Sequence, residues 1–460
     1  MNVLLVSANV ESLPDPVFPV GLAWLAASLK KNRIPYRILD LCFAEDYEEA
    51  ISKAIYDFPP DVVGVSLRNL DNVSYPYSVS YLPFYRRVVN AIRTWTQAPV
   101  VLGGSGFALV PGPIMEHLGA DFGIAGEGEL SFARLVLEME REGMGGGAPR
   151  QRSGVVIEDL DALGLPDRTG LDNEAYLKRG GMGNVQTKRG CPRRCIYCTY
   201  PLLEGRRIRL RKPERVCDEI EDLVSQGVDH LFFVDNVFND PSEHAKALSR
   251  EISRRKIKVK WSCYANPKYM TEELVEEMVF AGCTGVEFGT DSAHPGILKT
   301  LGKDLDVEDI RTASELCKQA GLAFCHSLLL GGPGETMETV QHSLDTIVET
   351  SPTACVCMVG IRIFPNTRLA EVAAQEGKLE PGEQFLHPVF YLSTGIKEWI
   401  LPFLEDFSKR NPTWIFPGLK INMDERLQSK LRRFGIRGPL WEYMKTGARF
   451  RAYAGSRRAR

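Results

Sequence analysis

Strand and helix patterns alternate at a steady pace through most of this chain, and this alternation limits its fold more than any other feature. In the first 145 residues, short β-branched runs are separated by amphipathic helix patterns such as Leu22–Lys31 and Tyr85–Thr94. Successive βα units predict an α/β fold with a parallel sheet covered by helices on both faces, doubly wound in the flavodoxin or Rossmann manner. The strand candidates are Val3–Val6, Tyr36–Leu39, Val62–Val65, Val100–Leu102 and Phe122–Ile124.

Small and polar residues follow the predicted strands of this first domain. In doubly wound sheets, ligands bind beyond the carboxyl ends of the strands. Small residues at those ends let a bulky ligand approach the backbone closely. The candidate binding residues are Ser7, Ser66, Arg68, Asn69, Gly103, Gly104, Ser105, Gly126 and Glu127.

A second series of strand patterns follows, mostly spaced by about 30 residues, the length of one βα unit. Six units predict a partial (β/α)6 barrel of the TIM type, with its chemistry at the carboxyl ends of the strands. We expect a first domain over 1–145, a linker over 146–180 that starts near the glycine-rich Gly143–Gly147, a barrel over 181–375, and a small aromatic and basic domain over 376–460. The strand candidates are Asn184–Lys188, Leu231–Val234, Val259–Ser262, Val286–Gly289, Ala323–Leu330 and Cys355–Ile363.

A loop with three cysteines follows the first strand of this second series. Cys191, Cys195 and Cys198 form a C-x3-C-x2-C pattern within a chain that has eleven cysteines. The start of the chain lacks a signal-peptide pattern, and no run approaches the roughly 20 apolar residues that span a bilayer, so we expect a cytoplasmic protein without disulfides. Thiolates this close together indicate a soft metal centre, either an iron–sulfur cluster or a zinc ion completed by a remote ligand.

Several short motifs accompany the cysteine loop in a characteristic order. In the second series they are Phe232–Asn236, Glu287–Ser292, Leu330–Thr336 and Gly360–Thr367, and in the first domain Pro19–Leu29, Leu102–Gly104 and Asp121–Glu129. Together with the cysteine loop, these motifs resemble the cobalamin-binding class of the radical S-adenosylmethionine superfamily. The resemblance covers about Asn2 to Ala374, which is most of the chain.

The resemblance implies three cofactors: a [4Fe–4S] cluster, S-adenosylmethionine and cobalamin. Cys191, Cys195 and Cys198 would bind the cluster, whose fourth iron holds S-adenosylmethionine, and Tyr197 would lie near the adenine. Gly21, in the motif after the first strand, joins the candidates that bind cobalamin. For each residue at the barrel rim, a structural hydrogen bond is the alternative to a ligand contact. The rim residues that could contact S-adenosylmethionine are Asp235, Asn236, Glu287 and Thr290.

Three further residues are candidates for a catalytic role. We hypothesise that Arg68 lies beneath the cobalt, because a fixed cation cannot ligate the metal and would favour loss of a methyl group. The alternative is an ion pair between Arg68 and Asp71. Arg362, at the end of the sixth strand, could pair with a carboxylate. His326, inside the fifth strand, could act on the substrate, although a lone histidine in an apolar strand is more often a core residue.

The reaction implied by the resemblance is transfer of a methyl group from S-adenosylmethionine, through methylcobalamin, to an unactivated or weakly nucleophilic carbon of a small molecule of the aromatic, natural-product or lipid type. The alternative within the same class is a rearrangement or oxidative cyclisation without methyl transfer. A methylthiolation reaction would need a second cluster, but the first 190 residues contain only Cys42. A non-enzymatic cobalamin or redox sensor would need no open iron.

The expected partners follow from the same class. They are a small-molecule substrate and, where the cluster must be reduced, an electron donor such as a flavodoxin or ferredoxin. Residues 420–460 contain 12 Lys and Arg against 3 Asp and Glu. Because these charges are scattered and no RNA-binding motif accompanies them, we do not expect a nucleic-acid partner.

Overall fold

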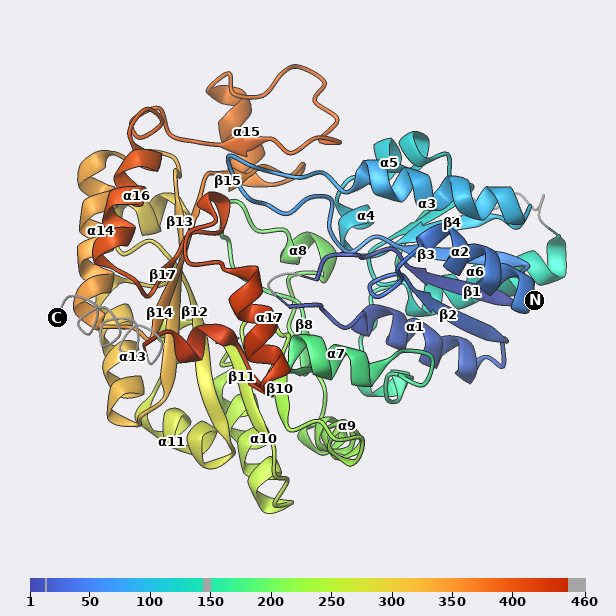
Figure 1. The fold of residues 1–460 in the computed structure, drawn as a ribbon, viewed down its shortest axis with the longest axis horizontal. Coiled ribbons are helices and arrows are strands. Elements are labelled where there is room, and N and C mark those ends of the chain that lie inside the picture. Colours follow the sequence, from blue (N-terminus) through green and yellow to red (C-terminus); the bar gives the residue numbers. More distant parts are fainter. Residues whose placement is uncertain (13–14, 144–149, 446–460) are drawn as a thin grey trace.

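Two lobes built on parallel sheets lie side by side in the computed structural model, which describes residues 1–12, 15–143 and 150–445 (Figure 1). The first lobe holds a sheet with the order β2-β1-β3-β4-β5-β6. Its first five strands have the flavodoxin-like order, and all five match predicted strands, so the doubly wound fold is confirmed. The strands are β1 (Val3–Ser7), β2 (Tyr36–Asp40), β3 (Val62–Ser66), β4 (Val100–Gly103), β5 (Phe122–Ala125) and β6 (Gln151–Ser153).

Helices cover both faces of this sheet because its strands are apolar on both sides. Val3 and Leu5 pack with one set of helices, and Leu4 and Val6 pack with the other. All four side chains are fully buried. The helices are α1 (Val20–Lys31), α2 (Tyr47–Asp57), α3 (Leu82–Trp95), α4 (Ser105–Leu109), α5 (Pro111–Leu118) and α6 (Glu129–Glu142).

The second lobe is a partial barrel with the strand order β17-β14-β13-β12-β11-β10-β7. Six of these strands correspond to the predicted barrel strands, which confirms this part of the fold. The seventh, β17 (Trp414–Ile415), comes from the C-terminal segment and pairs in parallel with β14. The six are β7 (Gly183–Val185), β10 (His230–Phe233), β11 (Lys260–Ala265), β12 (Cys283–Asp291), β13 (Ala323–Leu330) and β14 (Ala354–Val359).

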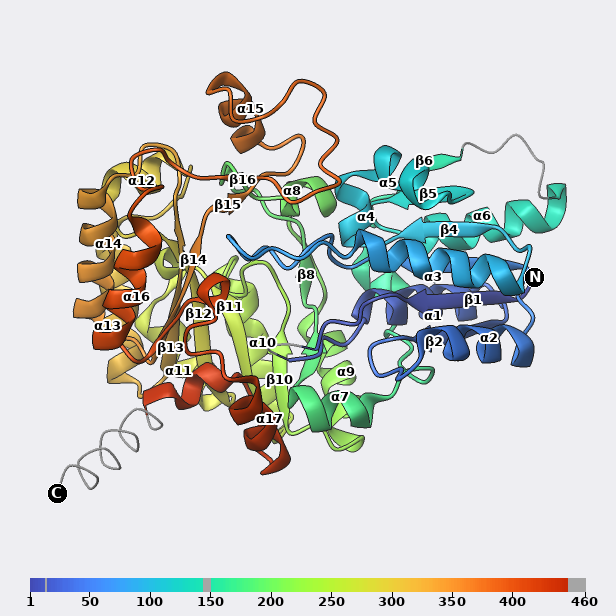
Figure 2. The same cartoon turned by 45° about the horizontal axis from the view of Figure 1, so that its top comes forward.

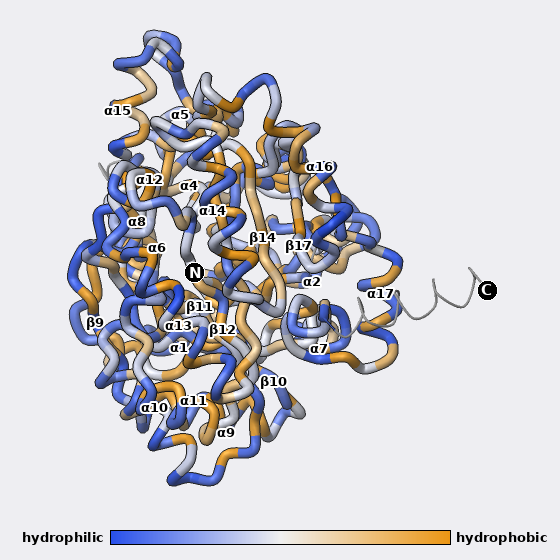
Figure 3. Tube along the Cα trace, turned by 90° about the vertical axis from the view of Figure 1, so that its left-hand side faces the viewer, coloured by the Kyte–Doolittle hydropathy of each residue, from blue (hydrophilic) through white to orange (hydrophobic). Residues whose placement is uncertain are grey.

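The two faces of the central barrel strands differ in their access to water. On β12, Val286, Phe288 and Thr290 are fully buried, whereas the alternate residues Glu287 and Gly289 are partly exposed. Because side chains alternate along a strand, the buried set faces the outer helices and the exposed set faces the lumen. In Figure 3 the barrel strands are mainly hydrophobic in colour. The outer helices are α9 (Pro213–Ser225), α10 (Ser242–Arg254), α11 (Glu272–Phe280), α12 (Pro295–Thr300), α13 (Val307–Gln319) and α14 (Met337–Thr350).

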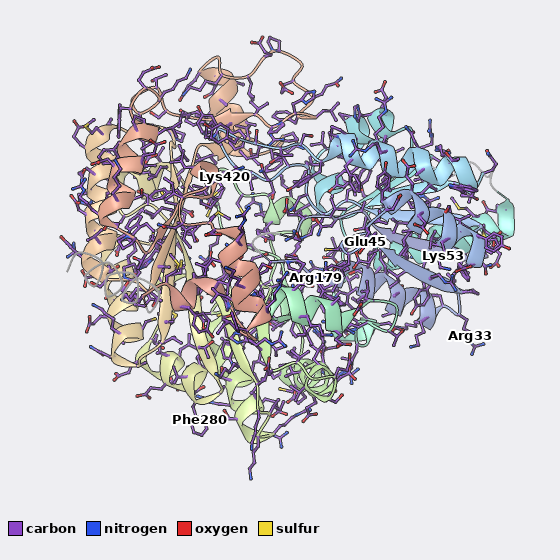
Figure 4. The ribbon with its side chains drawn as sticks, viewed as in Figure 1. Arg33, Glu45, Lys53, Arg179, Phe280 and Lys420 are labelled. Atoms are coloured by element: carbon purple, nitrogen blue, oxygen red, sulfur yellow. The ribbon has the colours of Figure 1, made fainter. Side chains whose placement is uncertain are left out.

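The segment predicted as a linker is structured where it is described. Strand β6 extends the first sheet, and α7 (Asn173–Gly180) packs against the first lobe, where Arg179 stacks 4.6 Å from the ring centre of Phe43 (Figure 4). In the glycine-rich stretch Gly143–Gly147, every residue after Gly143 lies outside the described residues. The other connecting elements are η1 (Leu160–Leu163) and η2 (Pro267–Tyr269).

The C-terminal segment runs along the outside of the barrel and then beneath it (Figure 2). It closes the amino-terminal end of the lumen with Trp441, which packs against Cys325 and Ala354. Residues 446–460, which carry much of the predicted basic tail, lie outside the described residues. No described helix is long and apolar enough to cross a lipid bilayer. The elements are β15 (Ile361–Arg362), α15 (Arg368–Gln375), β16 (Phe390–Tyr391), α16 (Ile400–Arg410), η3 (Pro417–Leu419), α17 (Glu425–Arg433) and η4 (Leu440–Tyr443).

Candidate active site between the lobes

The cysteine loop lies inside a small hairpin at the carboxyl end of the barrel. Strand β8 (Lys188–Arg189) leads into it and β9 (Arg209–Leu210) returns from it, with the short helix α8 (Tyr200–Leu203) between them. Gly190 turns the chain with a φ of 92°, and a Cβ there would lie 2.1 Å from the carbonyl oxygen of Arg207. Only glycine therefore fits the position that directs Cys191 into the loop.

The three loop thiols are free and close to one another. Cys191 is buried, and Cys195 and Cys198 are half-buried. Burial, together with the neighbouring Cys195 and Cys191 thiols, raises the pKa of Cys198 to about 12, and burial also raises the pKa of Cys195. Three thiolates at this position need positive charge to balance them.

The arrangement of the thiols fits a cluster better than a single ion. Within the described ranges, no three His, Cys, Asp or Glu side chains converge as a single metal ion requires. In a cubane cluster each thiolate binds a different iron, so the sulfurs need not converge on one point. The chemistry of this donor set is therefore that of an iron–sulfur cluster, with three thiolates and one iron left for another ligand.

Tyr197 connects the cysteine loop to the end of strand β12. Its hydroxyl donates a hydrogen bond to the carboxylate of Asp291, which has the left-handed φ of 64°. The Nζ atom of Lys303 lies 2.7 Å from the same carboxylate and 2.7 Å from the carbonyl oxygen of Gly289. Asp291 and Lys303 thus form a buried charged pair beside the thiols. Neither residue was predicted from the sequence: Asp291 lies in the motif Glu287–Ser292, but Lys303 lies in a loop without a recognisable pattern.

Asp235 and Asn236 support the loop through protein contacts. Asp235 is buried and accepts hydrogen bonds from the backbone nitrogens of Thr187 and Lys188, at 2.7 and 3.2 Å. Asn236 donates from Nδ2 to the carboxylate of Glu204 at 2.8 Å. Asp235 therefore holds the strand that precedes the cysteines, and Asn236 positions a carboxylate on the wall of the cleft described below.

Two other rim candidates, Thr290 and His326, lie on the outer face of the barrel. The Nδ1 atom of His326 is 2.7 Å from the hydroxyl of Thr290, and its Nε2 atom is 3.0 Å from the hydroxyl of Ser314 on α13. Both residues are fully buried. Because these side chains face the helices and satisfy one another, their placement argues against the predicted roles in catalysis and cofactor binding.

The buried His326 predicts a specific dependence of stability on pH. Burial lowers its pKa to about 3, so the unfolded chain gains a proton below the ordinary pKa of 6.5 that the folded chain does not. Between pH 6.5 and 5, the wild type should lose about 2 kcal/mol more than the His326→Gln variant. Urea unfolding at several pH values measures this difference, and parallel curves for the two proteins would contradict it.

Arg362 forms a bridge between the lobes. Its Nε atom lies 2.8 Å from the carboxylate of Asp71, which belongs to the loop after β3, and both side chains are buried. Its other nitrogens donate to backbone carbonyl oxygens, including that of Ile363 at 2.5 Å. This guanidinium is occupied by protein groups, which argues against the predicted contact with a substrate carboxylate. Since Asp71 pairs with Arg362, the alternative pairing of Asp71 with Arg68 does not form.

A deep cleft separates the two lobes at the carboxyl ends of both sheets. It contains about 1660 Å3 of space free of protein atoms, its open mouth included. Asn69 lies off the cleft, where its carbonyl oxygen accepts a hydrogen bond from Tyr85 at 2.6 Å. The other first-lobe candidates all line the cleft: Ser7, Gly21, Ser66, Arg68, Gly103, Gly104, Ser105, Gly126 and Glu127.

The first-lobe wall of the cleft is a backbone cradle of the kind that a large cofactor needs. Gly104 has a φ of 94°, and a Cβ there would lie 2.6 Å from the carbonyl oxygen of Leu67. Behind it, the apolar side chains of Leu5, Val101 and Phe132 form the inner wall. A cradle of small residues backed by an apolar wall fits a bulky, partly apolar ligand such as cobalamin.

The barrel contributes the opposite wall, and the sequence analysis did not find its residues. They come mainly from the hairpin around the cysteine loop, so the cleft adjoins the candidate cluster site. Burial raises the pKa of Glu204, which accepts a hydrogen bond from the backbone nitrogen of Gly190 at 3.0 Å. Most of these residues lie inside the cysteine hairpin, and this closeness to the cysteines in sequence was the signal that could have identified them. They are Asn184, Gln186, Arg189, Tyr200, Leu203, Glu204 and Val234.

Glu127 joins the two walls of the cleft through buried ion pairs. Its carboxylate lies 2.9 Å from Nη1 of Arg209 and 3.5 Å from Nη1 of Arg189, and Glu129 lies 2.6 Å from Nη2 of Arg189. All four side chains are at most 7% exposed. The carboxylate of Glu127 pairs with Arg189 and Arg209, which both belong to the cysteine hairpin. Glu127 therefore connects this hairpin to the first lobe at the edge of the cleft.

Loss of the Glu127 carboxylate should destabilise the chain strongly. In the Glu127→Gln variant, two buried guanidinium groups lose a shared counter-charge, and breaking a buried pair in this way costs about 3–5 kcal/mol. The matched control is Glu349→Gln, which removes an exposed pair with Arg311 and should cost less than about 1 kcal/mol. Urea midpoints of the two variants test this, and equal midpoints would contradict it.

Comparison with known proteins agrees with this two-lobed site. The B12 binding domain profile matches residues 6–136, and the radical SAM superfamily profile matches residues 185–347. Tryptophan 2-C-methyltransferase of Streptomyces laurentii is 29% identical over 445 residues, covering 80% of this chain and 74% of that protein. Anaerobic magnesium-protoporphyrin IX monomethyl ester cyclase of Rubrivivax gelatinosus is 26% identical, covering 76% of this chain and 66% of that protein.

A solved structure resembles the whole chain. It is the radical S-adenosylmethionine methyltransferase TsrM of Kitasatospora setae, with tryptophan and an S-adenosylmethionine analogue bound. It superposes with a TM-score of 0.87 at 26% identity, covering 100% of this chain and 99% of the other. With both profiles matched in order and one relative superposed end to end, the chain belongs to the cobalamin-binding class of radical S-adenosylmethionine enzymes.

Proposed function

We propose that this enzyme methylates a weakly nucleophilic carbon of a small aromatic molecule, with S-adenosylmethionine as the methyl source. The observation that carries the proposal is the single cleft that brings the glycine cradle of the first lobe against the hairpin of the three free thiols. Cobalamin, when bound, supplies a carrier for the methyl group. The similarity to tryptophan 2-C-methyltransferase supports an aromatic acceptor.

Each part of the cleft has a proposed task. Cys191, Cys195 and Cys198 would hold the cluster, with Tyr197, Asp291 and Lys303 beside S-adenosylmethionine. Tyr200 and Glu204 line the cleft beside the cysteine loop and would lie between the two cofactors. The residues that would hold cobalamin are Ser7, Gly21, Ser66, Gly103, Gly104, Ser105 and Gly126.

Arg68 is proposed as the cation that faces cobalamin. It lines the cleft, and in the described ranges it forms no ion pair with a carboxylate. A guanidinium cannot ligate a metal ion, but its positive charge opposes an increase of positive charge on a nearby metal ion. We expect Arg68→Ala to change the cobalamin spectrum and to slow methyl transfer by about 100-fold. An unchanged spectrum with unchanged turnover would exclude this role, and Arg68→Lys tests whether charge alone suffices.

The test of the proposed function uses methyl-labelled S-adenosylmethionine. The chain is purified without oxygen, its cluster is reconstituted, and hydroxocobalamin and a chemical reductant are added. Label should appear first in the corrinoid fraction and then, with tryptophan or a cell extract, in a product one methyl group heavier. Label in neither fraction would refute methyl transfer.

The alternative is a reaction of the same class without methyl transfer. The similarity to the magnesium-protoporphyrin cyclase supports this alternative reaction. In that case the product mass shows no added carbon, and 5′-deoxyadenosine accumulates with turnover. In either case, we propose a flavodoxin or ferredoxin as the electron donor, which a reconstituted assay with and without each protein would test.

A further inference from the structure

The lumen of the barrel contains a carboxylate, Glu287, that has no cationic partner in the part of the chain that the structure describes. Glu287 lies on the inner face of β12, and among the described residues the only hydrogen bond to its side chain comes from the hydroxyl of Ser327 at 2.8 Å. Among the described residues, no Lys, Arg or His lies within 4.0 Å of it as an ion-pair partner. Glu127, Asp71 and Asp291 differ, since each pairs with an Arg or Lys. Asp235 and Glu204 also differ, since each accepts a hydrogen bond from at least one backbone nitrogen.

Glu287 is deep in the barrel but accessible from the lumen. It lies on the strand between β11 and β13, and in the strand register it faces Tyr264 and Cys325. Its neighbours on the inner face, including Gly289 and Ser327, are also partly exposed. Burial raises the pKa of Glu287, and a hydrogen bond from Ser327 lowers it. A carboxylate in this position is costly unless a ligand with a matching charge enters the lumen.

Aromatic side chains form the wall beside this carboxylate. Tyr264 is 41% exposed, although its strand is internal to the sheet. Its ring packs edge-on against the ring of Phe232, with 4.9 Å between the two ring centroids. Glu287 raises the pKa of Tyr264 and Arg68 lowers it, so Tyr264 lies within electrostatic range of both the lumen carboxylate and the arginine of the cofactor cleft. Glu287 is therefore flanked by an aromatic wall on the side of β10 and β11.

The other end of the lumen is closed. Trp441 and Glu442 of η4 insert beneath β12, where a Cβ on Gly285 would lie 2.5 Å from Oε1 of Glu442. Thr284 donates a hydrogen bond to the same carboxylate at 3.3 Å. A molecule therefore cannot enter the lumen from this end. The opposite end lies on the cofactor side, which is where the acceptor of the proposed reaction must lie.

We propose that the lumen binds the acceptor and that Glu287 pairs with a protonated amine on it, while the aromatic ring of the acceptor packs against Tyr264 and Phe232. This inference rests on the proposed function and names the acceptor class as aromatic amines. A paired ammonium group restores charge balance to Glu287, and an aromatic ring matches a wall of aromatic rings. Neutral or acidic aromatic compounds of the same size leave the carboxylate unpaired.

Two probes with the same ring system test this assignment. Tryptamine carries an ammonium group and indole-3-propionate carries a carboxylate, so binding of each is measured by calorimetry on the enzyme loaded with cluster and cobalamin. Tryptamine should bind at least about tenfold more tightly than indole-3-propionate. Glu287→Gln should weaken tryptamine by at least about tenfold and should not weaken indole-3-propionate.

Matched variants separate the charge from the shape of the site. Ser327→Ala keeps the carboxylate and should leave tryptamine affinity within about threefold of the wild type, because only a neutral hydrogen bond is lost. Cluster and cobalamin spectra identical to the wild type show that Glu287→Gln is folded. No preference for tryptamine, including no binding of either probe, or equal tryptamine affinity in wild type and Glu287→Gln, overturns the inference.

The labelling experiment distinguishes failure of this inference from failure of the proposed function. Appearance of label in the corrinoid fraction needs no acceptor and does not involve Glu287. If label appears there but the two probes bind alike, only the assignment of the acceptor is wrong. If no label appears in the wild type, the proposed function fails whatever the probes do.

Discussion

Cys195→Ala should eliminate the iron–sulfur cluster and reduce methyl transfer to background while cobalamin still binds. Two thiolates, Cys191 and Cys198, would remain, and each of three irons needs its own protein ligand for the fourth iron to stay open. The residues of the cobalamin cradle belong to the first lobe, and the cysteine hairpin contributes only to the opposite wall of the cleft. Iron and sulfide analysis, visible absorption and the label assay measure the three outcomes.

The matched control for this prediction is Cys217→Ala. Cys217 is fully buried on α9 and packs in the barrel core as a small apolar residue. Its replacement should cost about 1 kcal/mol of stability and leave iron, sulfide and turnover near wild-type values. Full cluster content in Cys195→Ala, or cluster loss in Cys217→Ala, would show that the ligand assignment is wrong.

Gly104→Ala should weaken cobalamin binding at least about tenfold and leave the cluster intact. Gly104 has a φ of 94° and a ψ of 166°, a region essentially limited to glycine, where another residue is strained by about 1–3 kcal/mol. The new Cβ would also lie 2.6 Å from the oxygen and 2.9 Å from the nitrogen of Leu67. Both are backbone atoms, so the turn that carries Arg68 must move. Equilibrium dialysis with hydroxocobalamin measures the affinity.

A second glycine of the first lobe separates backbone strain from the clash in the cradle. Gly119 has a φ of 67°, but a Cβ there would meet no atom within 4 Å, and it lies outside the cleft. Gly119→Ala places an L-residue in the left-handed helical region (φ 67°, ψ 36°), which costs about 1–2 kcal/mol without a clash, and the variant should bind cobalamin like the wild type. Equal losses of affinity in both variants would mean that the effect is general instability, and not the shape of the cradle.

The sequence predicts the repetitive parts of this fold well. Strands β1, β3, β4 and β5 are largely apolar runs, because a parallel sheet is covered on both faces. Strand β2 lies at an edge and has only the apolar core Ile38–Leu39 beside Tyr36. Strand β6 escapes the prediction because its residues Gln151–Ser153 are polar and lie at an edge. Strand β17 has only two residues, and its position depends on the path of a long C-terminal segment.

Apolar residues on both faces of a strand explain which site residues the sequence misplaces. His326 alternates with Phe324 and Leu328, but the other face of β13 also carries apolar residues, so the sequence gives no signal of which face is the lumen. Arg362 pairs with Asp71 across 291 residues, and a contact at that separation leaves no local pattern. The cysteine loop was recognisable because its three cysteines lie close together in the sequence, between Cys191 and Cys198. Lys303 was missed because folding alone brings it to the site, whereas Glu204 was missed although it lies close to Cys198 inside the cysteine hairpin.

The buried pairs Glu127–Arg209 and Asp71–Arg362 carry a consequence for protein engineering. Each pair places its acid on one lobe and its base on the other, so neither lobe satisfies its own buried charges. An isolated barrel would retain guanidinium groups with no counter-charge, and an isolated first lobe would retain the matching carboxylates. Chimaeras that exchange lobes between relatives should therefore fold only when both members of each pair are transferred or already present.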